Sequence, residues 1–76
     1  MGKLDLAEKY LTEAAEILPR DATVQEHLGD LFARKGHWKR AAELYRVALD
    51  LGPDETDEAK LKTKIAEAEQ KGAPSP

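Results

Sequence analysis

The chain has 76 residues, of which 41% are hydrophobic and 36% are charged, and its formal net charge is -3. A chain of this size forms one domain at most, and its slight negative charge excludes an extended nucleic-acid surface, which would show a basic excess. The absence of cysteine excludes disulfides and thiolate metal sites, and no apolar run approaches the roughly 20 residues that span a bilayer. We expect a soluble protein, cytoplasmic by default, that carries no cofactor and enters no membrane.

Prolines and glycines divide the sequence into four predicted helices, of which the first two are amphipathic. The first runs from about Lys3 to Leu18 and ends at Pro19. Its apolar residues recur at steps of three and four, the spacing of one helix face, and they are Leu4, Ala7, Leu11, Ala14 and Leu18. The second helix follows Asp21, a good N-cap residue, and ends at Gly36. Its apolar stripe consists of Val24, Leu28, Leu31 and Phe32.

The third and fourth predicted helices differ in how much of their surface is apolar. The third, from about His37 to Leu51, is closed by Gly52 and Pro53. Two neighbours should pack on its wide apolar face, which is formed by Trp38, Ala41, Leu44, Tyr45, Ala48 and Leu51. The fourth, from about residue 57 to 71, has only a narrow stripe of Leu61, Ile65 and Ala68, so its other face should meet water. The expected fold class is all-α, with antiparallel helices joined by short connections.

The sequence repeats itself with a period of 34 residues. At this offset, residues in and beside the first helix align with identical residues in and beside the third helix. The aligned pairs are Gly2 with Gly36, Ala7 with Ala41, Ala14 with Ala48 and Pro19 with Pro53. The period and the pattern resemble the tetratricopeptide repeat, a helix-turn-helix unit that stacks into a right-handed solenoid. The resemblance implies a partial repeat over residues 1–21, a complete repeat over 22–55, a C-terminal capping helix over 56–71 and a disordered tail over 72–76.

The complete repeat contains the residues that carry this resemblance. They are Leu28, Gly29, Phe32, Gly36, Ala41, Tyr45, Ala48 and Pro53, with Trp38 beside them in the structural core. The resemblance implies that Gly29 and Ala41 let the two helices of the hairpin approach closely, and that Gly36 turns the chain between them. Trp38 and Tyr45 are then core residues rather than an aromatic binding pocket.

Two parts of the sequence depart from the family pattern. Gln25 stands where the family often has Trp, and we expect it near the exposed end of its helix. In the fourth helix, Leu61 and Ile65 lie one residue short of the family register. This helix therefore resembles the polar capping helix that closes a repeat array, or a degenerate repeat.

The resemblance also implies a binding groove, because proteins of this family hold a peptide on the face lined by the first helix of each repeat. The groove positions here are Thr23, Glu26, His27, Asp30, Ala33 and Arg34. One subclass grips a C-terminal carboxylate with Lys and Asn at two places that are Glu26 and Asp30 in this chain. A carboxylate ligand would meet like charge there, so we expect a basic or mixed-charge peptide.

A group of cations flanks the predicted turn between the second and third helices, and its members are Arg34, Lys35, Lys39 and Arg40. Acidic residues gather at the opposite end of the hairpin, from Asp50 to Glu58, so the module should be electrically polar across its width. This basic rim favours solubility, and Arg34 and Lys35 also offset a helix dipole. The alternative is a docking rim for an acidic partner, while the lack of interleaved aromatics makes it a weak nucleic-acid signal.

We expect no enzyme activity, because four short helices rarely enclose a dry catalytic pocket. His27 and His37 lie on different elements, which favours solvated positions over a metal or catalytic site. Two functions remain. The first is a scaffold or adaptor that binds a protein or peptide, as the terminal part of a longer repeat array. The second is a structural module that forms homo-oligomers through the first helix, which begins in mid-repeat and leaves an apolar face around Leu6 and Tyr10 uncovered.

Overall fold

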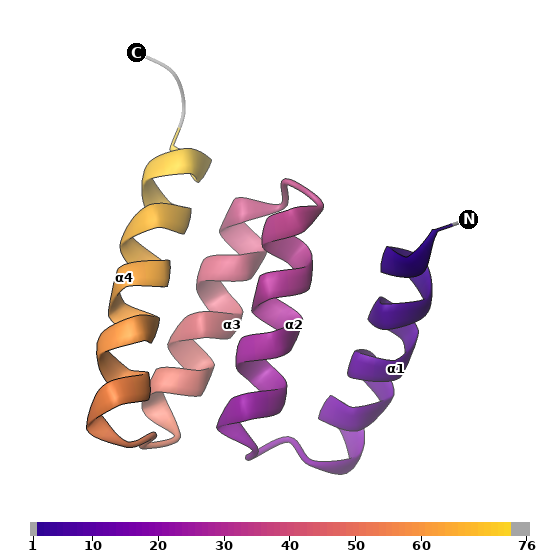
Figure 1. The fold of residues 1–76 in the computed structure, drawn as a ribbon, viewed down its shortest axis with the longest axis horizontal. Helices are drawn as coiled ribbons and strands as arrows, with labels where there is room; N and C mark the ends of the chain where they lie inside the picture. Colours follow the sequence, from indigo (N-terminus) through magenta and orange to yellow (C-terminus); the bar gives the residue numbers. More distant parts are fainter. Residues whose placement is uncertain (1, 74–76) are drawn as a thin grey trace.

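The computed structural model describes residues 2–73, and four helices make up most of this range (Figure 1). Their bounds are Lys3–Ile17 for α1, Ala22–Arg34 for α2, Trp38–Asp50 for α3 and Glu55–Gly72 for α4. Successive helices run in opposite directions, with the α2–α3 turn at one end and the other two connections at the opposite end. The all-α prediction is confirmed, and residues 2–73 contain no strand. None of these helices combines the length and the apolar character needed to cross a membrane.

Two aspartates set the starts of α2 and α4. The Asp21 carboxylate accepts a hydrogen bond from the Val24 amide at 3.1 Å, and the Asp54 carboxylate accepts one from the Asp57 amide at 2.8 Å. Both are N-caps that satisfy a backbone donor in the first helical turn. Because Asp54 is the cap, α4 begins at Glu55, earlier than predicted.

Glycines mark the ends of α2 and α3. Gly36 and Gly52 have φ values of 80° and 78°, a left-handed conformation that other residues rarely adopt. The chain therefore turns at Gly36 as predicted. Of the predicted tail, Gly72 still belongs to α4, and residues 74–76 lie outside the described residues.

The hairpin of α2 and α3 closes around Gly29. A Cβ atom at this position would lie 2.7 Å from Cε1 of Tyr45 and 3.3 Å from the carbonyl oxygen of Ala41. Tyr45 is 3% exposed and Ala41 is 0% exposed, so the contact is part of the core. Only a residue without a side chain allows the Tyr45 ring to pack here, which is the close approach that the sequence predicts.

The narrow apolar stripe of α4 packs on α3. Leu61 and Ala68 are 0% and 1% exposed, and they share a cluster with Ala48, which is also fully buried. The small side chain of Ala48 leaves room for this helix. Ion pairs on the charged side of α4 are Glu58–Lys62 at 3.0 Å and Glu67–Lys71 at 3.5 Å. Exposed pairs at this spacing each contribute only about 0.2–0.5 kcal/mol, so α4 is held mainly by its buried stripe.

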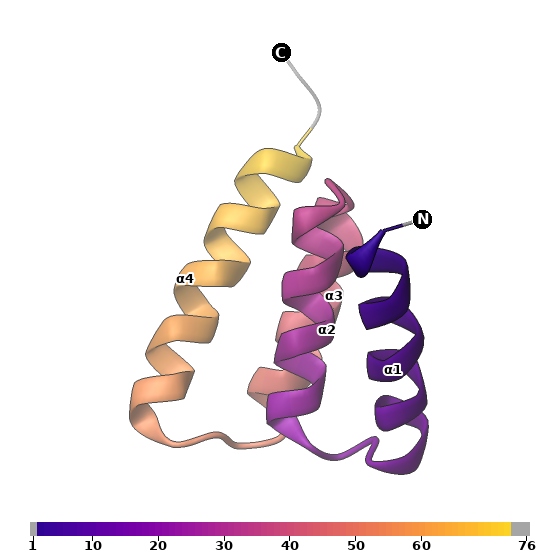
Figure 2. The ribbon, with the colours of Figure 1, turned by 45° about the vertical axis from the view of Figure 1, so that its right-hand side comes forward.

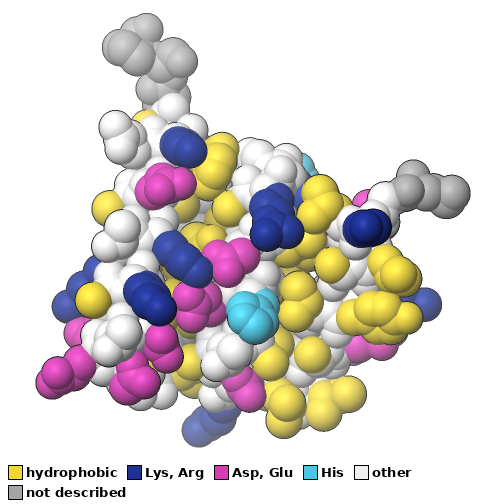
Figure 3. All heavy atoms as spheres, in the orientation of Figure 1, with side chains coloured by type: hydrophobic (Ala, Val, Ile, Leu, Met, Phe, Trp, Pro, Cys, Tyr) yellow, Lys and Arg dark blue, Asp and Glu magenta, His cyan; other side chains and the backbone are white. Residues whose placement is uncertain are grey.

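Helix α1 packs on α2 with one face and exposes apolar side chains on the other. The residues on its inner face are Leu4, Ala7, Leu11 and Ala15, which contact a cluster of Leu28, Leu31 and Leu44. On the outer face, Leu6, Tyr10 and Ile17 are 54%, 60% and 77% exposed. Figure 3 shows hydrophobic side chains gathered over α1 and its border with α2, whereas charged side chains are common over α4.

The predicted exposure of Gln25 is wrong. Its side chain is 7% exposed, and its Nε2 donates a hydrogen bond to the carbonyl oxygen of Pro19 at 3.2 Å. The α1–α2 connection, which contains Pro19, therefore contacts the side chain of Gln25. Because buried polar groups need partners, Gln25 attaches the connection to α2 at the place where the family often has Trp.

Gly29→Ala should destabilise the protein, although alanine favours a helix by about 1 kcal/mol over glycine. The added methyl group would displace the Tyr45 ring, so we expect a net loss of about 1–2 kcal/mol in the free energy of unfolding. Urea unfolding followed by circular dichroism measures this loss. The parent is the reference, because without the contact the helical preference of alanine would stabilise the variant. A variant that is as stable as the parent, or more stable, would contradict the close contact at Gly29.

Candidate peptide-binding site

The face of α2 between α1 and α4 carries the predicted groove residues (Figure 2). Thr23, His27 and Arg34 are exposed, and Glu26, Asp30 and Ala33 are half-buried. These residues share one side of α2 because they recur at steps of three and four. The structure therefore keeps the whole predicted set on one face, and it adds side chains from the neighbouring helices.

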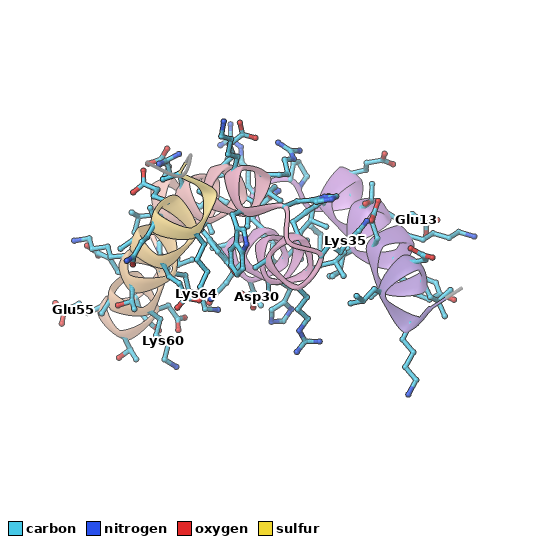
Figure 4. All side chains as sticks on the ribbon, turned by 90° about the horizontal axis from the view of Figure 1, so that it is seen from above. Glu13, Asp30, Lys35, Glu55, Lys60 and Lys64 are labelled. Atoms are coloured by element: carbon cyan, nitrogen blue, oxygen red, sulfur yellow. The ribbon has the colours of Figure 1, made fainter. Side chains whose placement is uncertain are left out.

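Lys64 of α4 reaches the two groove carboxylates. Its Nζ lies 2.7 Å from Oε2 of Glu26, and 3.0 and 3.2 Å from the two carboxylate oxygens of Asp30. Figure 4 shows Lys64 and Asp30 side by side between α4 and α2. Hydrogen bonds between charged groups are stronger than neutral ones. The acidic pair that the sequence assigns to a ligand thus already binds one cation of the same chain.

Tyr45 of α3 completes this arrangement. Its hydroxyl donates a hydrogen bond to Oδ1 of Asp30 at 2.6 Å, and Nζ of Lys64 lies 5.6 Å from the centroid of its ring. That distance is within the range of a cation–π interaction. We refer to Glu26, Asp30, Tyr45 and Lys64 as the ion cluster, which joins three helices.

Both titratable donors of the ion cluster keep their protons at neutral pH. Burial, and then the hydrogen bond to Asp30, raises the pKa of Tyr45 far above its usual value. Burial alone would lower the pKa of Lys64, but the carboxylates of Glu26 and Asp30 outweigh this effect and raise it. The hydroxyl and the ammonium therefore both remain hydrogen-bond donors.

Two hollows open on either side of a ridge formed by Asp30 and Arg34. The first, of about 440 Å³, lies between α2 and α4, and its lining includes Ala33, Trp38, Tyr45 and Lys64. The second, of about 350 Å³, lies between α1 and α2, and its apolar lining consists of Leu4, Ala7, Leu11 and Leu31. Asp30 and Arg34 line both hollows. Side chains of a bound segment could enter both.

The basic rim is partly neutralised by acidic neighbours. Lys35 forms an ion pair with Glu8 of α1, and Arg40 lies 3.0 Å from Glu43. The other two members, Arg34 and Lys39, are exposed. Figure 1 places this turn at the opposite end of the molecule from the α3–α4 connection, where the acidic residues of the sequence gather.

The two histidines lie apart on the surface. His27 is exposed on α2, and His37 precedes α3 with its ring stacked on Phe32 at a centroid distance of 5.9 Å. No three His, Cys, Asp or Glu side chains within residues 2–73 gather as a metal site. His37 covers the half-buried Phe32 at the turn, which is a packing role.

Lys64 is a residue of the candidate site that the sequence interpretation missed, although the N-caps carry a signal for it. Asp21 and Asp54 are 33 residues apart and cap α2 and α4 in the same manner. Aligning the two helices on these caps puts Lys64 at the position of Leu31, which faces the preceding helix. The period of 34 residues aligns α4 with α2 one residue away from the alignment on the caps. It therefore did not indicate that the side chain of Lys64 faces α2.

The antiparallel hairpin, its glycine contact and the open face of its first helix define a helical repeat module for protein interaction. Residues 26–59 match the model of the tetratricopeptide repeat family. Over 62 residues, the chain is 31% identical to cell division cycle protein 27 homolog A of Arabidopsis thaliana, and the match covers 82% of this chain. No solved structure matches the chain. The chain therefore contains a tetratricopeptide repeat, which the family model places at residues 26–59.

The comparisons also bear on the extent and the class of the protein. The chain spans 9% of the length of the Arabidopsis thaliana relative. The matched family and this relative both point to a repeat module that interacts with proteins rather than to a catalytic domain.

Tyr45→Phe should lower the free energy of unfolding by about 1.5–3 kcal/mol, as expected for a hydrogen bond to a charged group. The substitution removes the hydroxyl that binds Asp30 and leaves the ring against Gly29. Tyr10→Phe is the matched control, because Tyr10 is 60% exposed on α1. Urea unfolding compares the two variants, and identical midpoints would show that this hydrogen bond contributes nothing to stability.

Proposed function

We propose that this module binds an extended segment of a partner protein along the face of α2, between α1 and α4. The two hollows beside the ridge of Asp30 and Arg34 carry the proposal. Successive side chains of an extended segment point to opposite sides, so a segment that follows the ridge would place them alternately in the two hollows. The protein would act as a scaffold or adaptor. The polar outer face of α4 supports a position at the end of a longer repeat array.

The chemistry of the hollows favours a partner segment with basic and aliphatic residues. Asp30 and Lys64 line the hollow between α2 and α4, and Glu26 shares the ammonium of Lys64 with Asp30, so a net negative charge remains in the ion cluster. The hollow between α1 and α2 has an apolar lining that suits an aliphatic side chain. These features support the basic or mixed-charge peptide that the sequence predicts.

Reversal of both groove charges should switch the preferred peptide. The probes are acetylated and amidated peptides of repeating Lys-Leu-Ser or Glu-Leu-Ser. For Glu26→Lys combined with Asp30→Lys, we expect about tenfold weaker binding of the Lys-Leu-Ser peptide and tighter binding of the Glu-Leu-Ser peptide, because complementary charge becomes like charge. Titration calorimetry measures both affinities.

The control for this experiment carries the same change in charge away from the groove. Asp50→Lys combined with Glu55→Lys replaces two exposed carboxylates near the α3–α4 connection. Both double variants are compared at a temperature at which circular dichroism shows them to be folded. If they bind each peptide equally well, the face of α2 is not the binding site.

The outer face of α1 supports a second function, which is self-association. Leu6, Tyr10 and Ile17 follow one another on this face and are each more than half exposed. An apolar patch on a small protein usually marks an interaction site, and a second copy could cover it in a two-fold contact.

Tyr10→Glu should abolish this self-association. A contact between two single helices is smaller than a standard interface, so we expect the parent to dimerise with a dissociation constant of about 10 μM to 1 mM. Sedimentation velocity over a wide concentration range measures it. Thr12→Glu is the control, because Thr12 is exposed on another side of α1. A parent that stays monomeric at millimolar concentration would rule out this function.

A further inference from the structure

The ion cluster has the composition of a binding site for an ammonium group. The carboxylates of Glu26 and Asp30 offer three oxygens at 2.7, 3.2 and 3.0 Å from Nζ of Lys64. The ring of Tyr45 adds an aromatic face, with its centroid 5.6 Å from the same nitrogen. An ammonium group carries three donors on one nitrogen and is attracted to aromatic faces. The site thus satisfies all of its usual contacts.

The present occupant of this site is able to leave it. The side chain of Lys64 is 33% exposed, and it lines an open hollow of about 440 Å³. Helix α4 is held on α3 by Leu61 and Ala68, which are 0% and 1% exposed. The flexible stem of lysine can turn toward water without moving these buried residues. The ammonium can therefore leave the site while α4 stays in place.

We propose that Glu26, Asp30 and Tyr45 form a binding site for a lysine side chain of the partner, and that Lys64 fills this site when no partner is bound. This inference rests on the proposed binding of a partner segment along α2. On binding, the ammonium of the partner takes over the hydrogen bonds of Nζ, and Lys64 turns into the solvent. Lys64 is then an internal competitor of a basic partner.

The geometry favours lysine over arginine and over anions. The oxygens belong to two carboxylates and converge on one nitrogen, whereas a guanidinium presents its donors in a planar fork that suits a single carboxylate. Oδ1 of Asp30 also accepts a hydrogen bond from the hydroxyl of Tyr45 at 2.6 Å, so this oxygen is less available for a bidentate pair with a guanidinium. A carboxylate or phosphate group would be repelled by Glu26 and Asp30.

The competition determines which segments bind. The observed affinity of a basic partner is the affinity for the empty site multiplied by the fraction of molecules in which Lys64 leaves the site empty. Because Lys64 belongs to the same chain, its effective concentration at the site is about millimolar or higher. The concentration of free lysine in solution does not match this effective concentration. A lysine in a segment that is already anchored in the apolar hollow has a comparable effective concentration at the site. Binding is therefore selective for segments that use both hollows.

Lys64→Met tests this inference, since it keeps the length of the apolar stem of the side chain and removes the ammonium. We expect it to bind the Lys-Leu-Ser peptide about tenfold more tightly than the parent in titration calorimetry, because the competitor is absent and both carboxylates are unpaired. Lys60→Met is the matched control, with the same change in charge at an exposed position on the same helix (Figure 4). It should stay within about twofold of the parent, because the ammonium of Lys60 is exposed one helical turn from Lys64 and is screened by salt, whereas the ammonium of Lys64 contacts both carboxylates.

The outcomes separate this inference from the proposed function. If the parent binds the peptide and Lys64→Met binds it no more tightly than Lys60→Met, the competition by Lys64 is overturned while the binding face stands. If neither the parent nor the variants bind the peptide, the proposed function fails as well. Should Lys64→Met not fold, Lys64→Gln provides the same comparison, and parental affinity in that variant would also overturn the inference.

Discussion

The contact between Gly29 and Tyr45 is the constraint on which the rest of this structure depends. Because Gly29 has no side chain, the ring of Tyr45 occupies the contact between α2 and α3. The hydroxyl at the end of that ring then meets Asp30 at 2.6 Å on the open face of α2. A core residue thus positions a carboxylate of the candidate groove, and the packing of the hairpin is coupled to the charge of its outer face.

The same carboxylate connects the hairpin to α4. The carboxylate of Asp30 on α2 accepts hydrogen bonds from the hydroxyl of Tyr45 on α3 and from the ammonium of Lys64 on α4, so one residue links three helices. The cost of removing charges from water offsets much of the attraction in half-buried ion pairs, and the buried Leu61 and Ala68 already hold α4 on α3. The main consequence of the ion cluster is therefore that the carboxylates of Glu26 and Asp30 on α2 are paired with a cation of the same chain.

The elements of the fold were predictable because they depend on local signals or on one repeat. Apolar spacing indicated the helices, and Gly36 indicated the turn. The groove residues were predictable as a group because they share one face of α2. The burial of Gln25 could not be predicted, because it depends on the path of the α1–α2 connection, to which its side chain is hydrogen-bonded. Lys64 was missed because a difference of one residue in the register of α4 decides whether its side chain faces water or Asp30.

Nuclear magnetic resonance of the protein with labelled lysine tests most directly whether Lys64 occupies a site that a partner lysine can take. A side chain that ends over an aromatic ring experiences the ring current and lies close to the ring protons. We expect the Hε resonances of Lys64 to be displaced from those of Lys60 and to show Overhauser contacts with the Tyr45 ring. Both effects should vanish at saturation with the Lys-Leu-Ser peptide. Hε resonances of Lys64 that match those of Lys60 in the free protein, or that are unchanged at saturation, would contradict this claim.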